Sequence, residues 1–293
     1  MTSVPNALTF DLEHWYSATL VRDAVDDPRD RVHESVAIVR HLLDKHEVTA
    51  TFFVVGQLAR EYPDLIEQLA DDGHEIGSHG HTHTPLHDLT AVSFRRELAA
   101  SADAIESATG RRPEGFRAPN FSVGPETEWA FDALLAEGYR YDSSVFPAWT
   151  PMYGVPRAAV YPYSVDVTDP FTAKVDGELW EFPAAVFHPR IRMPIAGGFY
   201  ARLLPVRVIQ WGIRLLNRRE IPATLYFHPW EFNPAVKVAD LPSHNRFITF
   251  HGIDRTREKL DQLLNSFEFG SIEDVFGPMD DETQKNNSSS IVD

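Results

Sequence analysis

The feature that most constrains the fold of this 293-residue chain is the alternation of short apolar, strand-like runs with segments of helical periodicity. Strands that alternate with helices form βα units, and βα units build a parallel sheet. The pattern therefore predicts an α/β fold, namely a distorted or incomplete (β/α) barrel with about seven parallel strands. The strand-like runs lie at 7–10, 49–55, 115–117, 139–141, 179–182, 223–227 and 271–276.

Helical segments fill most of the intervals. In the second of them Thr90 is expected to cap the helix, which should end near Gly110. The segment 146–194 is rich in proline and aromatic residues and reads as a long loop insertion with short strands. We expect one domain over 1–277, followed by a disordered polar tail over 278–293. The expected helices span 32–43, 90–110, 126–137, 206–217 and 254–267.

Composition excludes several classes of function. A formal charge of −16 at pH 7 argues against nucleic acid and anionic membranes as partners. No run reaches the roughly 18 apolar residues that an integral membrane segment needs. The first residues lack the pattern of a signal peptide, and cysteine is absent, so a cytoplasmic location is expected. Without thiolates, any metal must bind His, Asp or Glu. The oligomeric state stays open.

Two carboxylates follow the first strand-like run. Asp11 and Glu13 are two residues apart, so on an extended segment their side chains point to the same side. Neighbouring carboxylates repel each other unless a cation or a proton lies between them. The pair is therefore a candidate cation site, although an acidic surface turn would have the same sequence.

A histidine-rich segment supplies further candidate ligands. Five histidines occur between His74 and His87. His79 and His83 are four apart, which on a helical turn places both imidazoles on one face and directs His81 elsewhere. Such a segment can be merely polar surface. Combined with the two carboxylates, however, it matches the His and carboxylate set of a catalytic metal site with open positions.

Two further polar residues, and a weaker third, stand at the ends of strand-like runs. Arg117 and His228 each follow a buried run, and Asp142 lies in the segment YDSS. Taken alone, each is more often structural, as a salt-bridging arginine or a hydrogen-bonded core histidine. They gain weight because active-site residues of α/β barrels lie at the carboxyl ends of strands.

These motifs, in this order, resemble those of NodB-type polysaccharide deacetylases, which are carbohydrate esterase-type domains. The resemblance covers about 7–275 and rests on TFDLE, SHGHTH, FRAPNF, YDSSVFP and LYFHP. It is greatest to the branch found beside exosortase and exopolysaccharide loci, which the runs GGFYARLLP and DRTREKL also resemble. Five ordered motifs are specific where any single one would be weak.

The resemblance implies a role for each matching residue. Asp11 matches the catalytic base, and His79 and His83 match the two metal-binding histidines. Most members of the family have a second, metal-binding Asp where this chain has Leu12. Some relatives use an Asp-x-acid variant, so Glu13 is the candidate third ligand. The implied cofactor is a divalent metal, with Zn²⁺ expected first and other divalent ions left open.

Three more roles follow from the same resemblance. Arg117 matches the residue that holds the base, Asp142 the acid that supports this arrangement, and His228 the general acid. Aromatic side chains near these motifs are candidates for stacking on sugar rings, although large aromatics more often belong to the core. The aromatic residues expected to bind substrate are Trp15, Phe121 and Trp230.

Three functions are compatible with the sequence. The first is a metal-dependent hydrolase that removes N-acetyl groups from the amino sugars of a poly- or oligosaccharide, with that carbohydrate as its partner. The second is a metal amidohydrolase acting on a small or cyclic amide. The third is a non-catalytic carbohydrate-binding or assembly protein that keeps the fold but has lost the usual ligand at Leu12.

Overall fold

The strand β1, Asn6–Leu12, is the central strand of a computed structural model that describes residues 4–26, 28–174, 177–238 and 241–277. β1 is buried along its whole length and pairs in parallel with three other strands. A strand that is covered on both faces is mostly apolar, and the three polar residues of NALTFDL, Asn6, Thr9 and Asp11, are buried with hydrogen-bond partners. Its partners are β2 (Thr51–Val54), β8 (Thr224–Phe227) and β9 (Phe269–Gly270).

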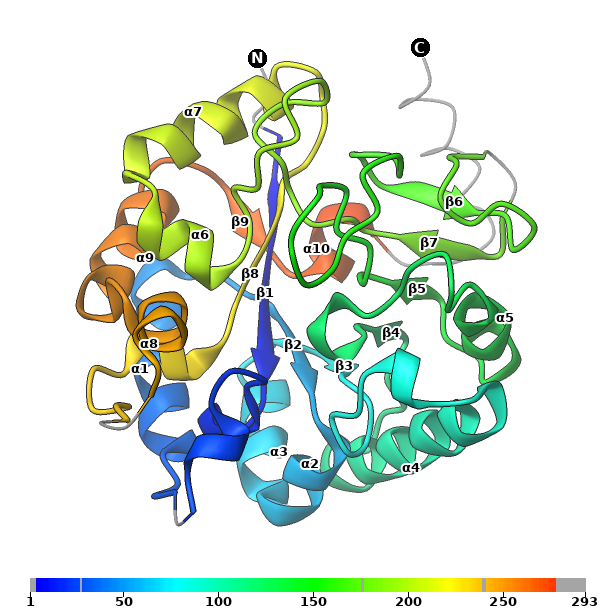
Figure 1. Cartoon of the computed structure of the whole chain (residues 1–293), viewed down its shortest axis with the longest axis horizontal. Coiled ribbons are helices and arrows are strands. Elements are labelled where there is room, and N and C mark those ends of the chain that lie inside the picture. The colour runs from blue at the N-terminus through cyan, green and yellow to red at the C-terminus, as the bar shows by residue number, and fades with distance from the viewer. Residues whose placement is uncertain (1–3, 27, 175–176, 239–240, 278–293) are drawn as a thin grey trace.

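The sheet continues from β2 in the order β3, β4, β5, β7 and β6, and it curls as Figure 1 shows. Among the described residues every strand pair is parallel except β6 with β7. The outer strands β6 and β8 are not neighbours in the strand order, so the barrel is incomplete. The predicted fold class is thus confirmed. The remaining strands are β3 (Glu75–Ser78), β4 (Gly115–Phe116), β5 (Tyr141–Asp142), β6 (Tyr163–Val165) and β7 (Leu179–Glu181).

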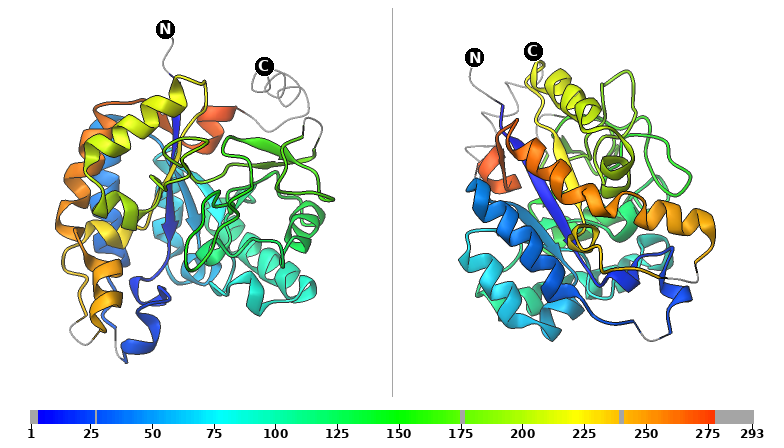
Figure 2. Two further views of the ribbon diagram at one scale, coloured as in Figure 1. Left: turned by 45° about the horizontal axis from the view of Figure 1, so that its top comes forward. Right: turned by 90° about the vertical axis from the view of Figure 1, so that its left-hand side faces the viewer.

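Helices lie along the outside of this curled sheet (Figures 1 and 2). α4 packs against α2, α3 and α5 on one flank, and α9 packs against α1, α6 and α7 on the other. The helices are α1 (Val32–His46), α2 (Gly56–Glu61), α3 (Pro63–Asp71), α4 (Ala91–Thr109), α5 (Trp129–Ala136), α6 (Gly198–Leu203), α7 (Val206–Asn217), α8 (Ser243–Phe250), α9 (Thr256–Leu264) and α10 (Ile272–Phe276).

Local sequence signals account well for α4. Thr90 and Ser93 form a reciprocal capping box at its start, and Gly110, with φ of 72°, closes its end in the left-handed conformation. Phe94 and Leu98 are buried on its inner face, as their spacing predicts. α7 also has the predicted bounds, whereas α5 and α9 are each shorter than expected at both ends.

Two local predictions fail. The segment 271–276 is not a strand but the helix α10, because the Ser271 side chain accepts a hydrogen bond from the Asp274 backbone and starts a helical turn. The strand of this region is the two-residue β9 just before it. β3 was not anticipated, because EIGS has neither a β-branched run nor clear alternation. Its partners β2 and β4 make it a strand.

The segment 146–194 contains β6 and β7 and, as expected, long connections, which form no helix over the described residues 146–174 and 177–194. The predicted tail over 278–293 lies outside the described residues. None of the helices in the described part of the chain combines the length and apolar character that crossing a bilayer requires.

Candidate active site

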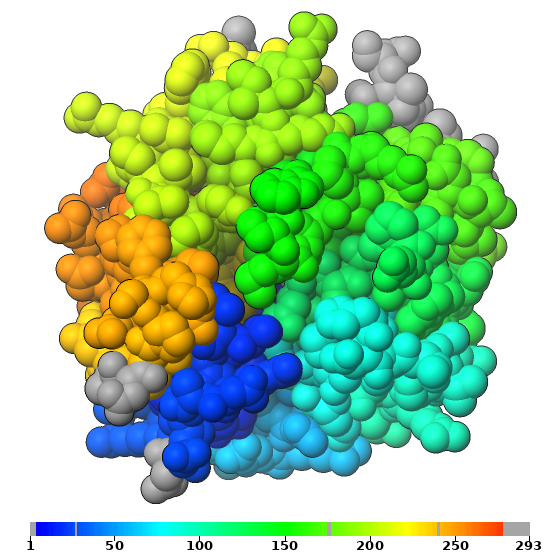
Figure 3. Space-filling model, in the orientation of Figure 1, coloured from blue at the N-terminus to red at the C-terminus, as the bar shows by residue number. Residues whose placement is uncertain are grey.

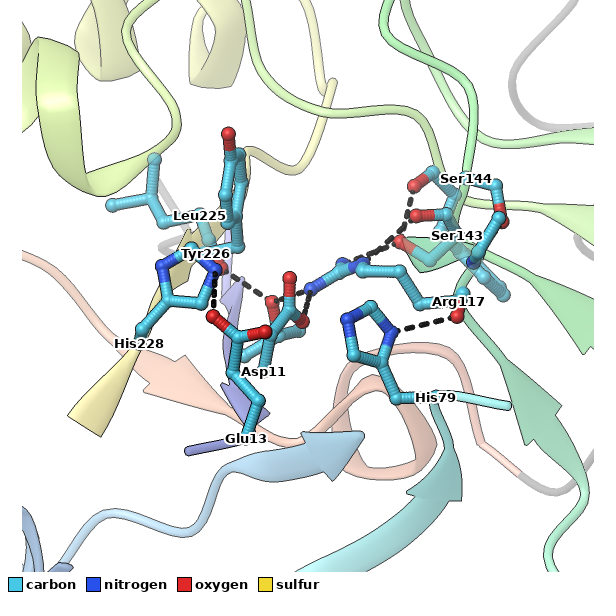
Figure 4. Close-up of polar contacts among 12 residues, drawn as sticks. Asp11, Glu13, His79, Arg117, Ser143, Ser144, Leu225, Tyr226 and His228 are labelled. Atoms are coloured by element: carbon cyan, nitrogen blue, oxygen red, sulfur yellow. Dashed lines mark hydrogen bonds and ion pairs between the residues drawn. The ribbon is translucent and has the colours of Figure 1, made fainter. Parts of the chain in front are cut away.

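Residues from β1, β3, β4 and β8 converge at the carboxyl ends of these strands (Figure 4). The six residues expected to form the site lie in a chain of contacts from Arg117 to His228. On this face the surface is hollowed between the segment that follows β1 and the green segments of the chain (Figure 3). A separate cavity of about 730 Å³ near Glu75 and Glu273 contains none of the six.

Arg117 fixes the position of Asp11. Its guanidinium is fully buried and donates through Nη1 to Asp11 Oδ1 at 2.8 Å and to Thr9 Oγ1 at 2.7 Å. Nε and Nη2 donate to the carbonyl and the hydroxyl of Ser143 at 2.9 and 2.7 Å, and the ring of Phe53 lies 4.3 Å away. A buried ion pair in which all three guanidinium nitrogens donate hydrogen bonds holds the carboxylate in one orientation. The predicted contact between Arg117 and Asp11 is therefore present.

Glu13 occupies the centre of the site. Its Oε2 lies 2.8 Å from His83 Nε2 and accepts from Ser17 at 3.1 Å. Its Oε1 accepts from the indole of Trp230 at 3.3 Å and lies 3.7 Å from His228 Nε2. Burial acts to raise the pKa of Glu13, but the charge and hydrogen bond of His83, with smaller contributions from the other histidines, hold it well below its usual value. Glu13 is thus an ionised carboxylate.

Leu12, between these two acids, points into the main hydrophobic core. Alternation along the strand places residues 11 and 13 on the opposite side, where both side chains reach the site. Where most members of the family have a ligand, this chain has a core residue, and the next residue supplies the carboxylate.

His79 is oriented as a metal ligand would be. Its Nδ1 lies 2.7 Å from the Arg117 carbonyl oxygen and must donate to it, which leaves the Nε2 lone pair available. Burial lowers the pKa of His79 to about 4, so the ring is neutral at physiological pH. The His79 and His83 rings lie 5.1 Å apart.

The predicted geometry of this segment needs correction. Residues 79–83 form no helical turn. They are a loop in which Gly80 and His83 have positive φ values of 73° and 58°. These two residues reverse the chain and bring the imidazoles together. His81 lies apart, close enough to Gly56 that a Cβ on this glycine would lie 2.5 Å from its Nδ1.

His228 is held by a residue that the sequence reading missed. Glu231, three residues further on, accepts from the His228 backbone N–H at 2.9 Å and lies 3.3 Å from its Nδ1. Burial lowers the pKa of His228, but the hydrogen bond and charge of Glu231, reinforced by Glu13 and Asp11, raise it to about 9. His228 is accordingly protonated and directs Nε2 towards Glu13. The spacing of three in HPWE, at the start of the short helix η5 (Pro229–Phe232), was the available signal.

The position of the Glu231 carboxylate is fixed in turn by residues of the motif GGFYARLLP. Buried Arg202 donates to Glu231 Oε1 at 3.1 Å, and Gly198 leaves room for the carboxylate, since a Cβ there would lie about 2 Å from it. Arg202 also donates to the carbonyls of Ile248 and His251 at 3.0 and 2.9 Å. This motif therefore belongs to the support of His228.

Asp142, the acid expected to support the position of Arg117, lies behind two serines. It is fully buried and accepts a hydrogen bond from Ser144, whose oxygen accepts from the Ala118 backbone N–H at 2.7 Å. Ser143 makes the direct contacts with Arg117. Asp142 is thus linked to Arg117 through this serine pair and by the attraction between their opposite charges.

The three aromatic residues expected to stack on sugar are buried. Trp15, Phe121 and Trp230 are each at most 6% exposed, and Trp15 packs with Trp230 in one apolar cluster. Phe121 packs against Tyr226, with ring centroids 4.6 Å apart. Their faces meet protein, which argues against a stacking role. Trp230 instead supports the site, through its hydrogen bond to Glu13 and its stacking on His228.

The donor set fits a divalent metal in its chemistry. A neutral imidazole with a fixed tautomer, a second imidazole and an ionised carboxylate are ligands that Zn²⁺ accepts. Among the described residues, however, no group of three or more His, Asp or Glu side chains has the spacing of a metal cluster. Glu13 and His83 contact each other directly, so a metal held between them would replace that contact.

Comparison with known proteins finds relatives for both halves of the chain. Residues 7–139 match the polysaccharide deacetylase family, and 143–277 match a domain of unknown function, DUF3473. A peptidoglycan deacetylase of Helicobacter pylori is 30% identical over 150 residues, which are 49% of this chain and 50% of that protein. A chitooligosaccharide deacetylase of Azorhizobium caulinodans is 36% identical over 92 residues, 31% of this chain and 44% of that protein.

The aligned regions thus span half or less of these relatives' own length. Among solved structures, a protein from Mycobacterium smegmatis assigned as a polysaccharide deacetylase superposes with a TM-score of 0.58. It is 20% identical and covers 92% of this chain and 87% of that one, which demonstrates a common fold. The similarity of this chain to polysaccharide deacetylases thus lies in residues 7–139.

Proposed function

We propose that this protein is a metal-dependent hydrolase that removes N-acetyl groups from the amino sugars of a poly- or oligosaccharide. One observation carries the proposal. An oriented carboxylate, Asp11, and a protonated imidazole, His228, flank a central carboxylate and two imidazoles. Amide hydrolysis needs a base, an acid and an electrophile in that arrangement. Two relatives are named as deacetylases of peptidoglycan and of chitooligosaccharides, and these names support an N-acetylated glycan as substrate.

In this proposal Glu13, His79 and His83 hold Zn²⁺ or another divalent ion. When bound, the ion polarises the acetyl carbonyl and makes a nearby water more acidic. Asp11, fixed by Arg117, accepts a proton from the water that attacks the carbonyl carbon. His228 donates its Nε2 proton to the departing nitrogen, so the products are acetate and a free amine.

The test is acetate release from N-acetylated chitooligosaccharides and peptidoglycan by protein that has been stripped of metal and then reloaded. Release that depends on the added metal is expected. Hydrolysis of small cyclic amides without acetate release would favour the amidohydrolase alternative. Metal binding with glycan affinity but no hydrolysis of either substrate would favour a binding protein.

Replacing His79 by alanine should abolish both metal binding and acetate release, because this ring presents a fixed lone pair to the site. His81→Ala is the matched control, since His81 lies in the same loop but packs beside Gly56. Metal content by elemental analysis should fall only in the first variant. Equal loss in both would mean that the ligand histidines are wrongly assigned.

A further inference from the structure

Two carboxyl groups face each other behind Arg117, on the side away from the proposed metal ligands. Asp142 on β5 and Glu181 on β7 are in register across a parallel strand pair, and both are fully buried. Residues opposite each other on adjacent strands direct their side chains to the same face. The two acids are 39 residues apart in sequence, and Glu181 lies outside the five sequence motifs on which the family resemblance rests.

Hydrogen-bond accounting points to a shared proton. Asp142 Oδ1 accepts from the Ser144 hydroxyl, and Glu181 Oε1 accepts from the Val145 backbone N–H at 3.0 Å. The other two oxygens, Asp142 Oδ2 and Glu181 Oε2, are buried and receive no donor from another residue in the described part of the chain. Leaving both as bare carboxylate oxygens would carry the full cost of desolvation. If one of these two oxygens carries a proton, it donates a hydrogen bond to the other, and neither is left without a partner.

In the part of the chain that the structure describes, no cation forms an ion pair with Asp142 or Glu181. The charge of Arg117 acts on both acids, but its guanidinium donates to Ser143, Thr9 and Asp11. Tyr163 on β6 is the titratable group on the other side, and its pKa is also raised. Burial is the largest cause of raised pKa values in Asp142 and Glu181, and the mutual repulsion of the two groups adds to it for Glu181.

We propose that Asp142 and Glu181 share one proton, with Glu181 as the donor and Asp142 as the acceptor, and that this singly charged pair positions Arg117. Glu181 is assigned as the donor because it accepts only the Val145 N–H. Asp142 accepts both the Ser144 hydroxyl and the Ser143 backbone N–H, and these two hydrogen bonds favour its ionised form. Glu181 is then a positioning residue that acts through Asp142 and never touches substrate.

A few hydrogen bonds connect the Asp142–Glu181 pair to Asp11. Ser144, held by Asp142, accepts from the Ala118 backbone and fixes the segment that follows Arg117. Ser143, next to Asp142, donates to the Phe182 carbonyl and accepts from Arg117. Arg117 in turn holds Asp11. This inference rests on the proposed function only in taking Asp11 as the base.

Amide substitutions test the shared proton. In Glu181→Gln the amide N–H replaces the acid O–H, so the pair keeps one negative charge, on Asp142. In Asp142→Asn the new amide donates to Glu181, which then carries that charge. Each single variant should keep kcat within about 1.5-fold of wild type, whereas the double variant, which has no charge, should lose roughly tenfold or more in kcat with little change in KM. Additive losses in kcat would overturn the proposal.

Two measurements do not require activity. Infrared spectra of the wild type at neutral pH should contain the C=O band of a buried protonated carboxyl, and Glu181→Gln should lack it. Because the folded-state pKa of Glu181 is raised, its stabilising contribution is present at low pH and is lost as pH rises through that pKa. The melting temperature of Glu181→Gln should accordingly fall less than that of wild type on alkalinisation. If the band is absent from wild type, both acids are ionised and the proposal fails, whatever the enzyme assay shows.

Discussion

Asp11→Asn should retain metal and lose turnover by a factor of roughly 10² to 10⁴, the range that a general base contributes. The side-chain oxygen of Asn can still accept from Arg117, so the geometry survives while the proton acceptor is gone. Glu13→Gln should instead lose metal, because a neutral amide is a weaker ligand than a carboxylate. Elemental analysis and acetate release on both variants separate the two roles.

The matched control for this pair is Glu61→Gln. Glu61 contacts His14 at 3.1 Å near the site but is half exposed, and neither activity nor metal content should change. The assignment would be reversed if Asp11→Asn emptied the site while Glu13→Gln stayed active and loaded.

Glu231→Gln should affect substrates according to their leaving groups. The carboxylate orients His228 and holds its proton, so its loss should reduce hydrolysis of an N-acetyl amide by roughly 10²-fold. An activated aryl acetate needs no protonation of its leaving group, so its hydrolysis should fall only slightly. Rate ratios for the two substrates, measured on wild type and variant, check this result.

The same variant should alter the pH profile. His228 must be protonated to act as an acid, and its pKa is raised to about 9 mainly by Glu231. As the pH is raised, activity towards the amide should therefore begin to fall at a lower pH in the Glu231→Gln variant than in wild type. Glu258→Gln, at an exposed position of helix α9, is the control. If the rates of hydrolysis of the amide and of the aryl ester fall equally, Glu231 has only a structural role.

Local sequence patterns were sufficient to predict some features of this structure. Alternation along β1 put Asp11 and Glu13 on one side, and a capping residue with a terminal glycine marked α4. Both signals act within a few residues of the chain, which is why sequence alone reveals them. The parallel sheet and the incomplete barrel followed from the alternation of elements, whereas the order of the strands did not.

Other features depend on contacts between distant segments. β3 is a strand because β2 and β4 pair with it, and the side chains that support Asp11 and His228 come from residues far along the chain. The proximity of His79 to His83 was predicted for the wrong reason, since a loop with two positive φ values replaces the helical turn. Backbone reversals of that kind follow from packing around the loop.

The order of the strands has one more consequence. β8, from the DUF3473 segment, lies directly beside β1, while β7, from the same segment, lies beside β5 at the other flank of the sheet. The four strands of the first match, β1 to β4, thus lie together between strands of the second match, although the two matches are consecutive in sequence. Neither segment has a complete hydrogen-bonded sheet without the other, so the domain should unfold in a single cooperative transition. A gene cut at the boundary between the matches would yield two fragments that regain structure only by associating.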